Sequence, residues 1–218
     1  MCFEVMFFDL DETLYPSRTG IWQAIGIRMD SYILDRLGIE TNNVSAFRES
    51  LFRRYGTTLR GLREEYSIDE NEFLAYVHDI PLDQYLAEDS KLANVLELFP
   101  SRKAIFTNAD TNHARRVLRR LGVNSFFEQV IDIQRIHPFC KPMPEAFQLA
   151  LQAAAVSKPS DCVMIDDSEQ NLRAAHDLGM YTIRVGTEEH ADFIDAAIHT
   201  IHDLPLVIPV NQSRSTND

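Results

Sequence analysis

The chain has 218 residues, of which 45% are hydrophobic and 25% are charged, and its formal net charge at pH 7 is -12. These values are typical of a soluble globular protein with a sizeable core. The acidic balance argues against binding to a nucleic acid polymer, which needs a basic face, and against an anionic membrane surface.

The lack of recognisable targeting signals and the cysteine content both favour a cytoplasmic location. No apolar run reaches membrane-spanning length, and the short apolar N-terminus lacks the basic residues of a signal peptide. The three cysteines, Cys2, Cys140 and Cys162, fit neither a disulfide framework nor a zinc site. We therefore expect a cytoplasmic protein in a reducing compartment, with no membrane partner.

The first predicted element is a strand that runs into two aspartates. In "MFFDLDET" an apolar run is followed by Asp9 and Asp11. Residues two apart on a strand point to the same face, so the two carboxylates repel each other unless a cation lies near them. Such a cost usually has a functional reason. A strand that ends with both carboxylates in water is an equal alternative at this point.

Helical periodicity dominates the next segment, which we place at residues 15–98. In "IWQAIGIRMDSYILDRLG" apolar residues recur at helical spacing and a glycine ends the run. The stretch "NNVSAFRESLFRRYG" repeats the pattern, and "TTLRGLREEY" and "DENEFLAYVHD" predict two shorter helices. The last stretch, "LDQYLAEDSKLANVLELF", leads back toward the rest of the chain.

Strands and helices alternate from residue 103 onward. Strands are predicted at "KAIFT", "FEQVIDI", "DCVMID" and "MYTIRVG", and the arginines of the helix "NHARRVLRRLG" are expected to form a solvated face. The alternation predicts an α/β fold, a Rossmann-like parallel sheet with helices on both faces. The expected organisation is a discontinuous core at 1–14 and 99–208, an inserted α-helical cap at 15–98 and a disordered tail at 209–218.

Polar side chains gather where the predicted strands end or lead into a helix. These residues are Asp9, Asp11, Thr107, Asn108, Lys141, Asp166 and Asp167. In open α/β sheets, ligands bind at the carboxyl ends of the strands. Each residue alone has an ordinary explanation, such as a helix cap at Asn108 or a solvated Lys141. Those explanations give no reason for four clusters at one edge, so we interpret the set as one site.

The set suits the hydrolysis of a phosphate monoester, whose dianion repels an incoming nucleophile. Catalysis must supply a nucleophile, cancel charge and protonate the leaving oxygen. Asp9 can attack phosphorus to give an aspartyl-phosphate, and Asp11 can donate a proton and later take one from water. Carboxylates crowded around a phosphate also require a cation, and magnesium (Mg2+) prefers oxygen ligands.

In this order, "DLDET", "FTN", "KP" and "DDSEQN" resemble the four motifs of the haloacid dehalogenase-like hydrolases, most of which are phosphatases. A helical insertion after the first motif resembles the subfamily with a helical cap. Within it, "DLDETLYP", "GTTLRGL", "TNAD" and "DDSEQNLRAAHDLGM" resemble the pyrimidine 5′-nucleotidase branch. Glu12 stands where the family usually has glycine, which we interpret as a marker of that branch that disfavours sugar-phosphate mutase activity.

The resemblance implies a role for each matching residue. Mg2+ would be held by the Asp9 carboxylate, the Asp11 main-chain carbonyl and Asp166. Lys141 would neutralise both Asp9 and the phosphate. The implied phosphate-binding residues are Leu10, Asp11, Thr107, Asn108 and Lys141. The implied supporting residues behind the metal site are Asp167 and Asn171.

Cap residues are the candidates for specificity. Tyr15, Thr58 and Arg60 belong to "LYP" and "TTLRGL", which would face the site when the cap closes, although surface packing is an alternative. Hydroxyls and a guanidinium there can hold a pyrimidine ring or a ribose. The expected protein is a magnesium-dependent phosphomonoesterase for pyrimidine nucleoside 5′-monophosphates. It would act on a small phosphorylated metabolite as a monomer or small homo-oligomer.

Four alternatives remain open. One is a phosphatase for another small metabolite, such as a sugar phosphate or phosphoglycolate. A halide-removing enzyme needs the Asp9 nucleophile but no general acid at Asp11. A phospho-accepting signalling receiver also uses aspartates, threonine, lysine and magnesium, but the order of the residues and the long insertion oppose it. A catalytically silent nucleotide-binding protein is opposed by the full catalytic set.

Overall fold

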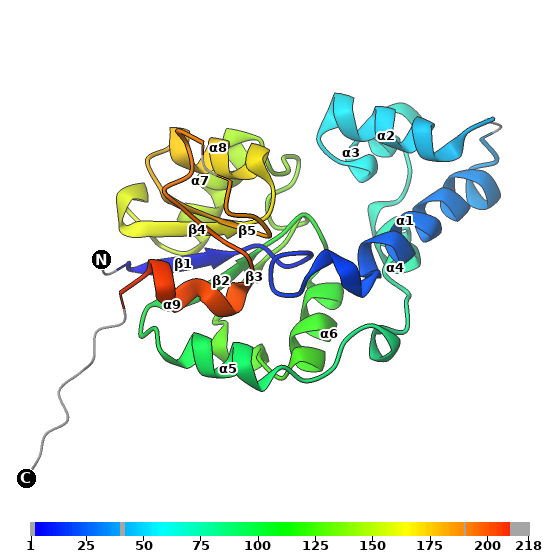
Figure 1. Cartoon of the computed structure of the whole chain (residues 1–218). Helices are drawn as coiled ribbons and strands as arrows, with labels where there is room; N and C mark the ends of the chain where they lie inside the picture. Colours follow the sequence, from blue (N-terminus) through cyan, green and yellow to red (C-terminus); the bar gives the residue numbers. More distant parts are fainter. Residues whose placement is uncertain (1–2, 40–41, 190, 210–218) are drawn as a thin grey trace, which may run out of the picture.

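The computed structural model describes residues 3–39, 42–189 and 191–209 and shows a sheet-based core with a helical cap at one end of it (Figure 1). The predicted tail, apart from its first residue, lies outside the described residues. No helix in the described part is both long and apolar enough to cross a membrane.

One six-stranded parallel sheet, with the strand order β3-β2-β1-β4-β5-β6, forms the centre of the core. Its strands are β1 (Val5–Phe8), β2 (Arg102–Phe106), β3 (Gln129–Ile131), β4 (Cys162–Asp166), β5 (Tyr181–Val185) and β6 (Ala196–Ile198). The prediction of a Rossmann-like parallel sheet is confirmed. The short edge strand β6 had no counterpart among the predicted strands.

Helices cover both faces of the sheet, as Figure 1 shows. One face carries α7 (Pro144–Ala153) and α8 (Glu169–Asp177), and the other carries α5 (Ser90–Glu97), α6 (Thr111–Leu121) and α9 (Leu204–Val207). Successive residues of β1 pack alternately against these two layers of helices. Val5 and Phe7 pack in the cluster on the α7 and α8 side, whereas Met6 and Phe8 pack in the cluster on the other side. A strand buried on both faces explains the continuous apolar run before Asp9.

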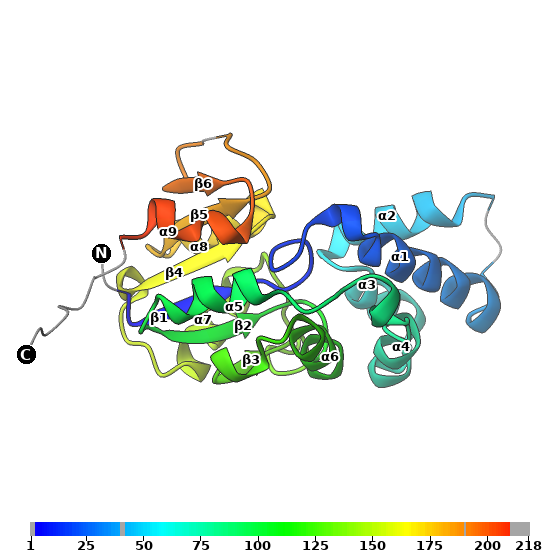
Figure 2. The ribbon, with the colours of Figure 1, turned by 60° about the horizontal axis from the view of Figure 1, so that its bottom comes forward.

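The cap stands beyond the carboxyl ends of the strands, which point toward it (Figure 2). Its helices are α1 (Ile21–Ser31), α2 (Val44–Tyr55), α3 (Thr58–Tyr66) and α4 (Glu70–Val77), and a π-helical turn, Tyr32–Arg36, extends α1. Tyr32 and Phe73 pack edge to face at 5.1 Å inside it. The buried apolar residues of the cap are continuous with the core cluster on the α5 and α6 side, and the cap overhangs the edge where the strands end.

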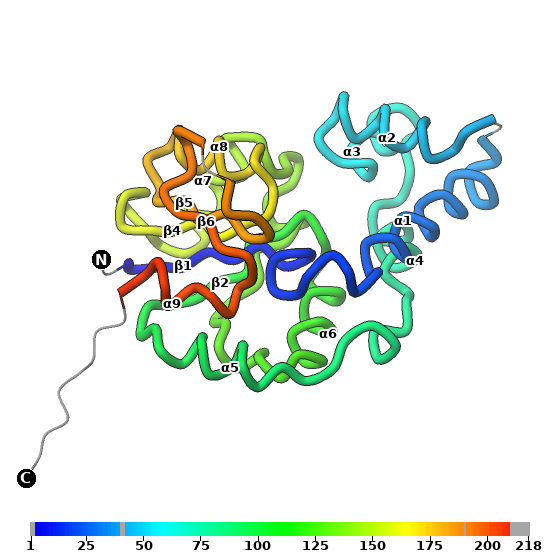
Figure 3. The backbone as a smooth tube through the Cα atoms, in the orientation of Figure 1, coloured from blue at the N-terminus to red at the C-terminus, as the bar shows by residue number. Residues whose placement is uncertain are grey.

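Helix α5 belongs to the core, although its periodicity resembles that of the cap helices. The residue before it, Asp89, donates its main-chain N–H to the Leu121 carbonyl at 3.0 Å, and its carboxylate lies 2.9 Å from His202 Nε2. The tube in Figure 3 shows α5 running beneath the sheet. We therefore propose that the cap ends before α5 rather than at residue 98, because periodicity does not tell which body a helix packs against.

The segment that returns from the cap is fastened to α6 by two arginines. Arg116 donates to the carbonyls of His78 at 2.7 Å and Ile80 at 2.6 Å, and Arg120 donates to the Leu86 carbonyl at 2.6 Å. These contacts correct the expectation of a fully solvated arginine face. A guanidinium can donate to carbonyls that have no partner within a helix or strand. Arginines on a helix face that resembles a solvated face can therefore also hold a neighbouring loop in place.

Candidate active site

The register of the sheet brings the predicted strand ends together. Phe8 of β1 is paired with Ile165 of β4, and the Asp9 main-chain N–H donates to the Ile165 carbonyl at 2.9 Å. The residues that follow on the two strands, Asp9 and Asp166, are therefore neighbours. They line a cavity of about 590 Å³ between the sheet edge and the cap, a size typical of small-molecule sites.

Lys141 lies between these two aspartates. Its ammonium donates to Asp9 Oδ1 at 2.7 Å and to Asp166 Oδ2 at 2.8 Å, and the whole residue is 1% exposed. Burial alone lowers the pKa of Lys141, but the carboxylates of Asp166 and Asp9 outweigh it and raise that pKa above its usual value. The side chain is therefore a permanent cation at the centre of the site.

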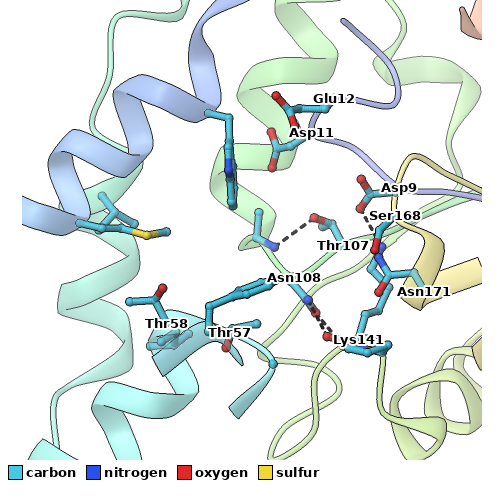
Figure 4. A pocket seen from close by; sticks show the side chains of 18 of the residues that line it. Asp9, Asp11, Glu12, Thr57, Thr58, Thr107, Asn108, Lys141, Ser168 and Asn171 are labelled. Atoms are coloured by element: carbon cyan, nitrogen blue, oxygen red, sulfur yellow. Dashed lines mark hydrogen bonds and ion pairs between the residues drawn. The ribbon is translucent and has the colours of Figure 1, made fainter. Parts of the chain in front are cut away.

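Asn108 holds the main chain of Lys141 in place. Its Oδ1 accepts the Lys141 N–H at 2.8 Å, and its Nδ2 donates to the Lys141 carbonyl at 2.9 Å (Figure 4). The Asn108 side chain is thus occupied by the lysine loop. Any contact of residue 108 with a phosphate is left to its main chain.

Three carboxylates converge closely enough to hold a divalent cation. Asp9, Asp166 and Asp167 each offer an oxygen, and these oxygens all lie within 4.8 Å of one another. Burial raises the pKa of Asp9, and the charges of Asp166 and Asp167 add to that effect against the opposing Lys141. Burial, with the neighbouring Asp166, also raises the pKa of Asp167 to about 7. A divalent cation would relieve this repulsion, so the donor set fits Mg2+.

Neighbouring groups orient the two aspartates at the end of β4. Asp166 Oδ1 accepts the Ser168 N–H at 2.9 Å and the Asn171 Nδ2 at 3.0 Å. Asp167 Oδ1 accepts the Thr13 hydroxyl at 3.0 Å, and the Thr13 oxygen accepts the Asp167 N–H at 3.1 Å. Asn171 was predicted to support the site and lies beside Asp166. Thr13 was not predicted, because a threonine after "DLDE" carries no signal of its own.

Asp11 has partners that sequence reasoning missed. Its Oδ1 accepts the Tyr15 hydroxyl and lies 2.8 Å from Nε2 of His113, a fully buried residue on α6. Burial raises the pKa of Asp11, but the charge and hydrogen bond of His113, with the hydrogen bond of Tyr15, outweigh it and lower that pKa. These contacts therefore favour the ionised form of Asp11.

The remaining predicted phosphate-binding residues lie at the floor of the cavity. Thr107 and Asn108 line it, and the Thr107 oxygen accepts the Ala109 N–H at 3.0 Å. The Leu10 side chain is fully buried, so only its main chain can face a ligand. Glu12 has φ of 63°, in the left-handed region. A glycine adopts that conformation without strain, whereas a residue with a side chain rarely does.

The cap forms the opposite wall of the cavity. Figure 4 shows Thr57 and Thr58, at the start of α3, facing the side chains of the core. The other cap residues on this wall are Trp22, Met29, Ser45, Arg48, Glu49, Phe52, Gly56, Leu59, Phe73, Leu74, Val77 and His78. The wall therefore combines aromatic rings with three hydroxyls and with the Arg48 guanidinium, which is ion-paired with Asp30 at 2.7 Å.

Two of the three predicted specificity residues do not line this wall. Tyr15 is bonded to Asp11, as described above. The Arg60 guanidinium donates to the Tyr55 carbonyl at 3.3 Å and lies 3.0 Å from the Met143 sulfur. Arg60 thus sits at a junction between cap and core rather than in the cavity. Thr58 alone among the three is placed where it can touch a substrate.

Comparison with known proteins identifies the family. The family model for haloacid dehalogenase-like hydrolases matches residues 3–179, most of the chain. "Phosphate metabolism protein 8" of Saccharomyces cerevisiae is 29% identical over 191 residues, which cover 81% of this chain and 60% of that protein. "Fructose-1-phosphate phosphatase" of Escherichia coli is 28% identical over 100 residues, which cover 45% of this chain and 52% of that protein. The chain thus spans a little over half the length of these two curated relatives.

Solved structures agree on the fold. A haloacid dehalogenase-like hydrolase of Bacillus subtilis, solved with bound magnesium, superposes with a TM-score of 0.61 at 17% identity and covers 96% of this chain and 100% of that one. At this level of identity the likeness establishes the shared architecture of sheet and inserted cap. The roles of individual side chains rest on the geometry described above.

Proposed function

We propose, because this chain belongs to the haloacid dehalogenase-like hydrolase family, that it is a magnesium-dependent phosphomonoesterase that acts through an aspartyl-phosphate on Asp9. The observation that carries the proposal is the buried ammonium of Lys141, bonded to both Asp9 and Asp166 at the cavity floor. A cation fixed against the nucleophile suits attack on a dianion, because it cancels charge on both partners at the point where they meet.

The first chemical step uses Asp9 and Asp11. The Asp9 carboxylate attacks phosphorus in line with the leaving oxygen, and the bond between phosphorus and that oxygen breaks. Asp11, two residues further along, must take up a proton from solvent before this step, and it donates that proton to the departing oxygen. In the second step Asp11 takes a proton from a water molecule, which attacks the aspartyl-phosphate and releases phosphate.

The other residues of the core stabilise charge. Lys141 neutralises Asp9 before the attack and the phosphoryl oxygens during it, and the Thr107 hydroxyl with nearby main-chain N–H groups can hold those oxygens. Asp9, Asp166 and the main-chain carbonyl of Asp11 would hold Mg2+, with Asp167 beside them. When bound, the ion would supply additional positive charge to the phosphoryl group.

The cap wall supports a nucleoside 5′-monophosphate as the substrate, and we propose a pyrimidine nucleotide. Aromatic side chains such as Trp22 and Phe52 suit a flat ring, and the Thr58 hydroxyl and Arg48 guanidinium can hydrogen-bond its edge or the ribose. The second candidate is a sugar phosphate, which is favoured by the similarity to the fructose-1-phosphate phosphatase. A sugar would use the same hydroxyls but leave the aromatic wall without a partner.

A panel of phosphate-release assays tests both the magnesium-dependent phosphatase activity and the substrate that we propose. The purified chain is assayed against pyrimidine and purine 5′-nucleotides, sugar phosphates and p-nitrophenyl phosphate, with Mg2+ or with a chelator. We expect the highest kcat/KM for UMP or CMP and complete loss of activity with the chelator. Preference for a sugar phosphate would replace the substrate proposal, and full activity after exhaustive chelation would contradict the metal proposal.

The nucleophile is tested by Asp9→Asn. A neutral amide cannot attack phosphorus, so this variant should bind Mg2+ and fold but lose turnover on every substrate in the panel.

For specificity, Thr58→Val keeps the shape of the side chain and removes its hydroxyl. It should lower kcat/KM for the preferred nucleotide by about tenfold and leave p-nitrophenyl phosphate nearly unaffected. Equal losses on both substrates would remove Thr58 from the specificity role.

A further inference from the structure

A buried array of side chains connects Asp11 to the end of the cap. His113 Nε2 lies 2.8 Å from Asp11 Oδ1, and the His113 ring stacks on His78 with centroids 4.3 Å apart and planes inclined by 19°. His78 Nδ1 in turn lies 2.5 Å from Asp110 Oδ2. Because His78 follows directly on α4, the array reaches from the proposed general acid and base to the last helix of the cap.

Both contacts that fix Asp11 fall on the same oxygen. The Tyr15 hydroxyl and His113 Nε2 bond Oδ1, and within the described part of the chain no hydrogen bond to Oδ2 is formed. Oδ1 carries no proton whether Asp11 is ionised or is protonated on Oδ2, so it accepts from both partners. With Oδ1 tied to the protein, Oδ2 is the oxygen left to exchange a proton at the cavity that Asp11 lines.

Hydrogen bonds alone do not fix the plane of the His113 ring. Its side chain is fully buried, and its second nitrogen, Nδ1, has no hydrogen-bond partner among the described residues. A ring held through one nitrogen can turn about that bond, so its orientation depends on packing. The stacked ring of His78 supplies that packing directly.

Asp110 and Arg116 fix His78 in turn. Asp110 caps α6 by accepting the His113 N–H at 3.0 Å on Oδ1, while its Oδ2 holds the His78 ring. Arg116, one turn further along α6, donates to the His78 carbonyl at 2.7 Å. One carboxylate therefore positions the helix that carries one histidine and the side chain of the other, and the backbone of His78 is fastened to the same helix.

We propose that His113 and His78 are positioning residues for Asp11, with His113 fixing the carboxylate and His78 fixing the His113 ring. The inference rests on the proposed function, in which Asp11 protonates the leaving oxygen. A displaced carboxylate transfers that proton poorly, and the loss grows with the basicity of the leaving group, because a good leaving group needs little protonation. A residue with a purely structural role would lower all rates together.

Aryl phosphates that differ only in their leaving group provide the test. The kcat/KM of His113→Phe, which keeps a ring and loses the donor, is measured on p-nitrophenyl phosphate and on phenyl phosphate. We expect a loss of about tenfold or more on phenyl phosphate and of less than about threefold on p-nitrophenyl phosphate. His113→Gln, which restores a donor, should recover part of the loss on phenyl phosphate.

The pair His78→Phe and His78→Ala tests the stack without altering a partner of Asp11. Phenylalanine keeps the stacking, so it should retain more activity on phenyl phosphate than alanine, which should show the same dependence on the leaving group as His113→Phe. His202→Phe is the matched control, because His202 also pairs with an aspartate, at 2.9 Å from Asp89, but lies outside the cavity. It should change neither rate.

Asp11→Asn is run in parallel to separate the two proposals. If Asp11→Asn lacks the dependence on the leaving group, the assigned role of Asp11 is wrong. If Asp11→Asn shows it but the histidine variants lose activity equally on both substrates, or lose none, positioning by the histidines is overturned. Melting temperatures identify any variant that loses activity through unfolding, and the His113→Gln and His78→Phe variants then decide the outcome.

Discussion

At the scale of single residues, Lys141 is a buried cation between two buried carboxylates, with its Nζ 2.7 Å from Asp9 and 2.8 Å from Asp166. Removing one partner of a buried ion pair leaves an uncompensated charge, which typically costs about 3–5 kcal/mol. Here two carboxylates would remain, and they would face each other. The same side chain therefore supports both the fold around the site and the chemistry proposed for it.

Lys141→Met keeps most of the side-chain volume and removes the charge. We expect kcat to fall about 100-fold or more, because charge stabilisation in the transition state is typically of this size. The melting temperature in a chelator should also fall. Lys103→Met is the matched control, since Lys103 is also buried but donates to the carbonyls of Phe99 and Ser101 at the far end of β2. It should lower stability and leave kcat unchanged, and equal losses of kcat would contradict the role of Lys141.

The raised pKa of Asp167, about 7, predicts how stability depends on pH without a metal. The folded state binds this proton more tightly than the unfolded chain, in which the carboxyl has its ordinary value of 3.8. The stabilising contribution of the proton is therefore fully present below about pH 4 and is lost as the pH rises through about 7. Asp9, whose pKa burial also raises, adds in the same direction.

Melting curves in a chelator between pH 4 and 8 check this expectation. Asp167→Asn should lose less stability across the range than the natural chain, whereas the exposed control Asp192→Asn should behave like the natural chain. Added Mg2+ should stabilise the natural chain most above pH 7, where the carboxylates are ionised. A pH profile that Asp167→Asn leaves unchanged would contradict the assignment.

At the scale of secondary-structure elements, the sequence predicted the strands that appear in it as apolar runs. Strands β1 and β4 are buried on both faces, so each appears as an apolar run that ends at the polar residues of the site, and β2 does so from Ala104 onward. The short strand β6 and the core location of α5 were not predictable in this way. Pairing at a sheet edge and the choice of a packing partner depend on contacts between segments distant in sequence.

The residues of the candidate site likewise divide into those that the sequence could predict and those that it could not. Asp9, Asp166 and Lys141 could be predicted because each follows or precedes an element boundary, and the structure brings them together. His113 could not, because one histidine in the pattern of an amphipathic helix gives no sign that its face meets Asp11. Its position depends on how α6 docks beside β1, which is a property of the assembled fold.

Packing between cap helices α2 and α3 depends on Gly61. A Cβ atom at this position would lie 2.8 Å from the Leu51 Cβ, which no rotation of the leucine can move away. Gly61→Ala should therefore push the helices apart and destabilise the protein by about 1–3 kcal/mol. Chemical denaturation measures the effect, and a midpoint equal to or above that of the natural chain would contradict it.

Gly26 on α1 is the matched control for Gly61. A Cβ there would lie 3.4 Å from the Arg48 guanidinium, the far end of a flexible side chain that can shift. Alanine is favoured over glycine in a helix interior by about 1 kcal/mol. Gly26→Ala should therefore be neutral or stabilising, so the two substitutions should have opposite signs if packing rather than helix propensity decides them.

At the scale of the whole molecule, the cap touches the core beside the site lysine. We call this region the cap–core contact, and it joins residues 55–63 of the cap to residues 137–143 of the core. Arg63 donates to the Pro138 carbonyl at 3.3 Å and lies 3.1 Å from His137 Nδ1. A Cβ on Gly56 would lie 3.1 Å from the Cys140 sulfur. The cap therefore contacts the loop that carries Lys141 directly.

Two buried thiols can report on this contact. Cys140 lies within the cap–core contact and Cys162 lies in β4, and both are almost fully buried. Burial raises the pKa of the Cys140 thiol and, together with nearby Glu4, raises that of Cys162 to about 12. Both should react slowly in the folded chain, because the thiolate is the reactive form. Opening of the cap would expose Cys140, whereas exposure of Cys162 requires the sheet to open.

Arg63→Ala should loosen the cap–core contact. The loss of about 1 kcal/mol would raise the open population about fivefold, and the rate at which N-ethylmaleimide modifies Cys140 should rise with it. Mass spectrometry of the two cysteine peptides over time gives both rates, and the Cys162 rate should not change. Arg54→Ala is the control, because it removes an ion pair at 2.7 Å to Glu65 within the cap. Equal acceleration at both cysteines would indicate general unfolding, and an unchanged Cys140 rate would show that Arg63 does not hold the cap on the core.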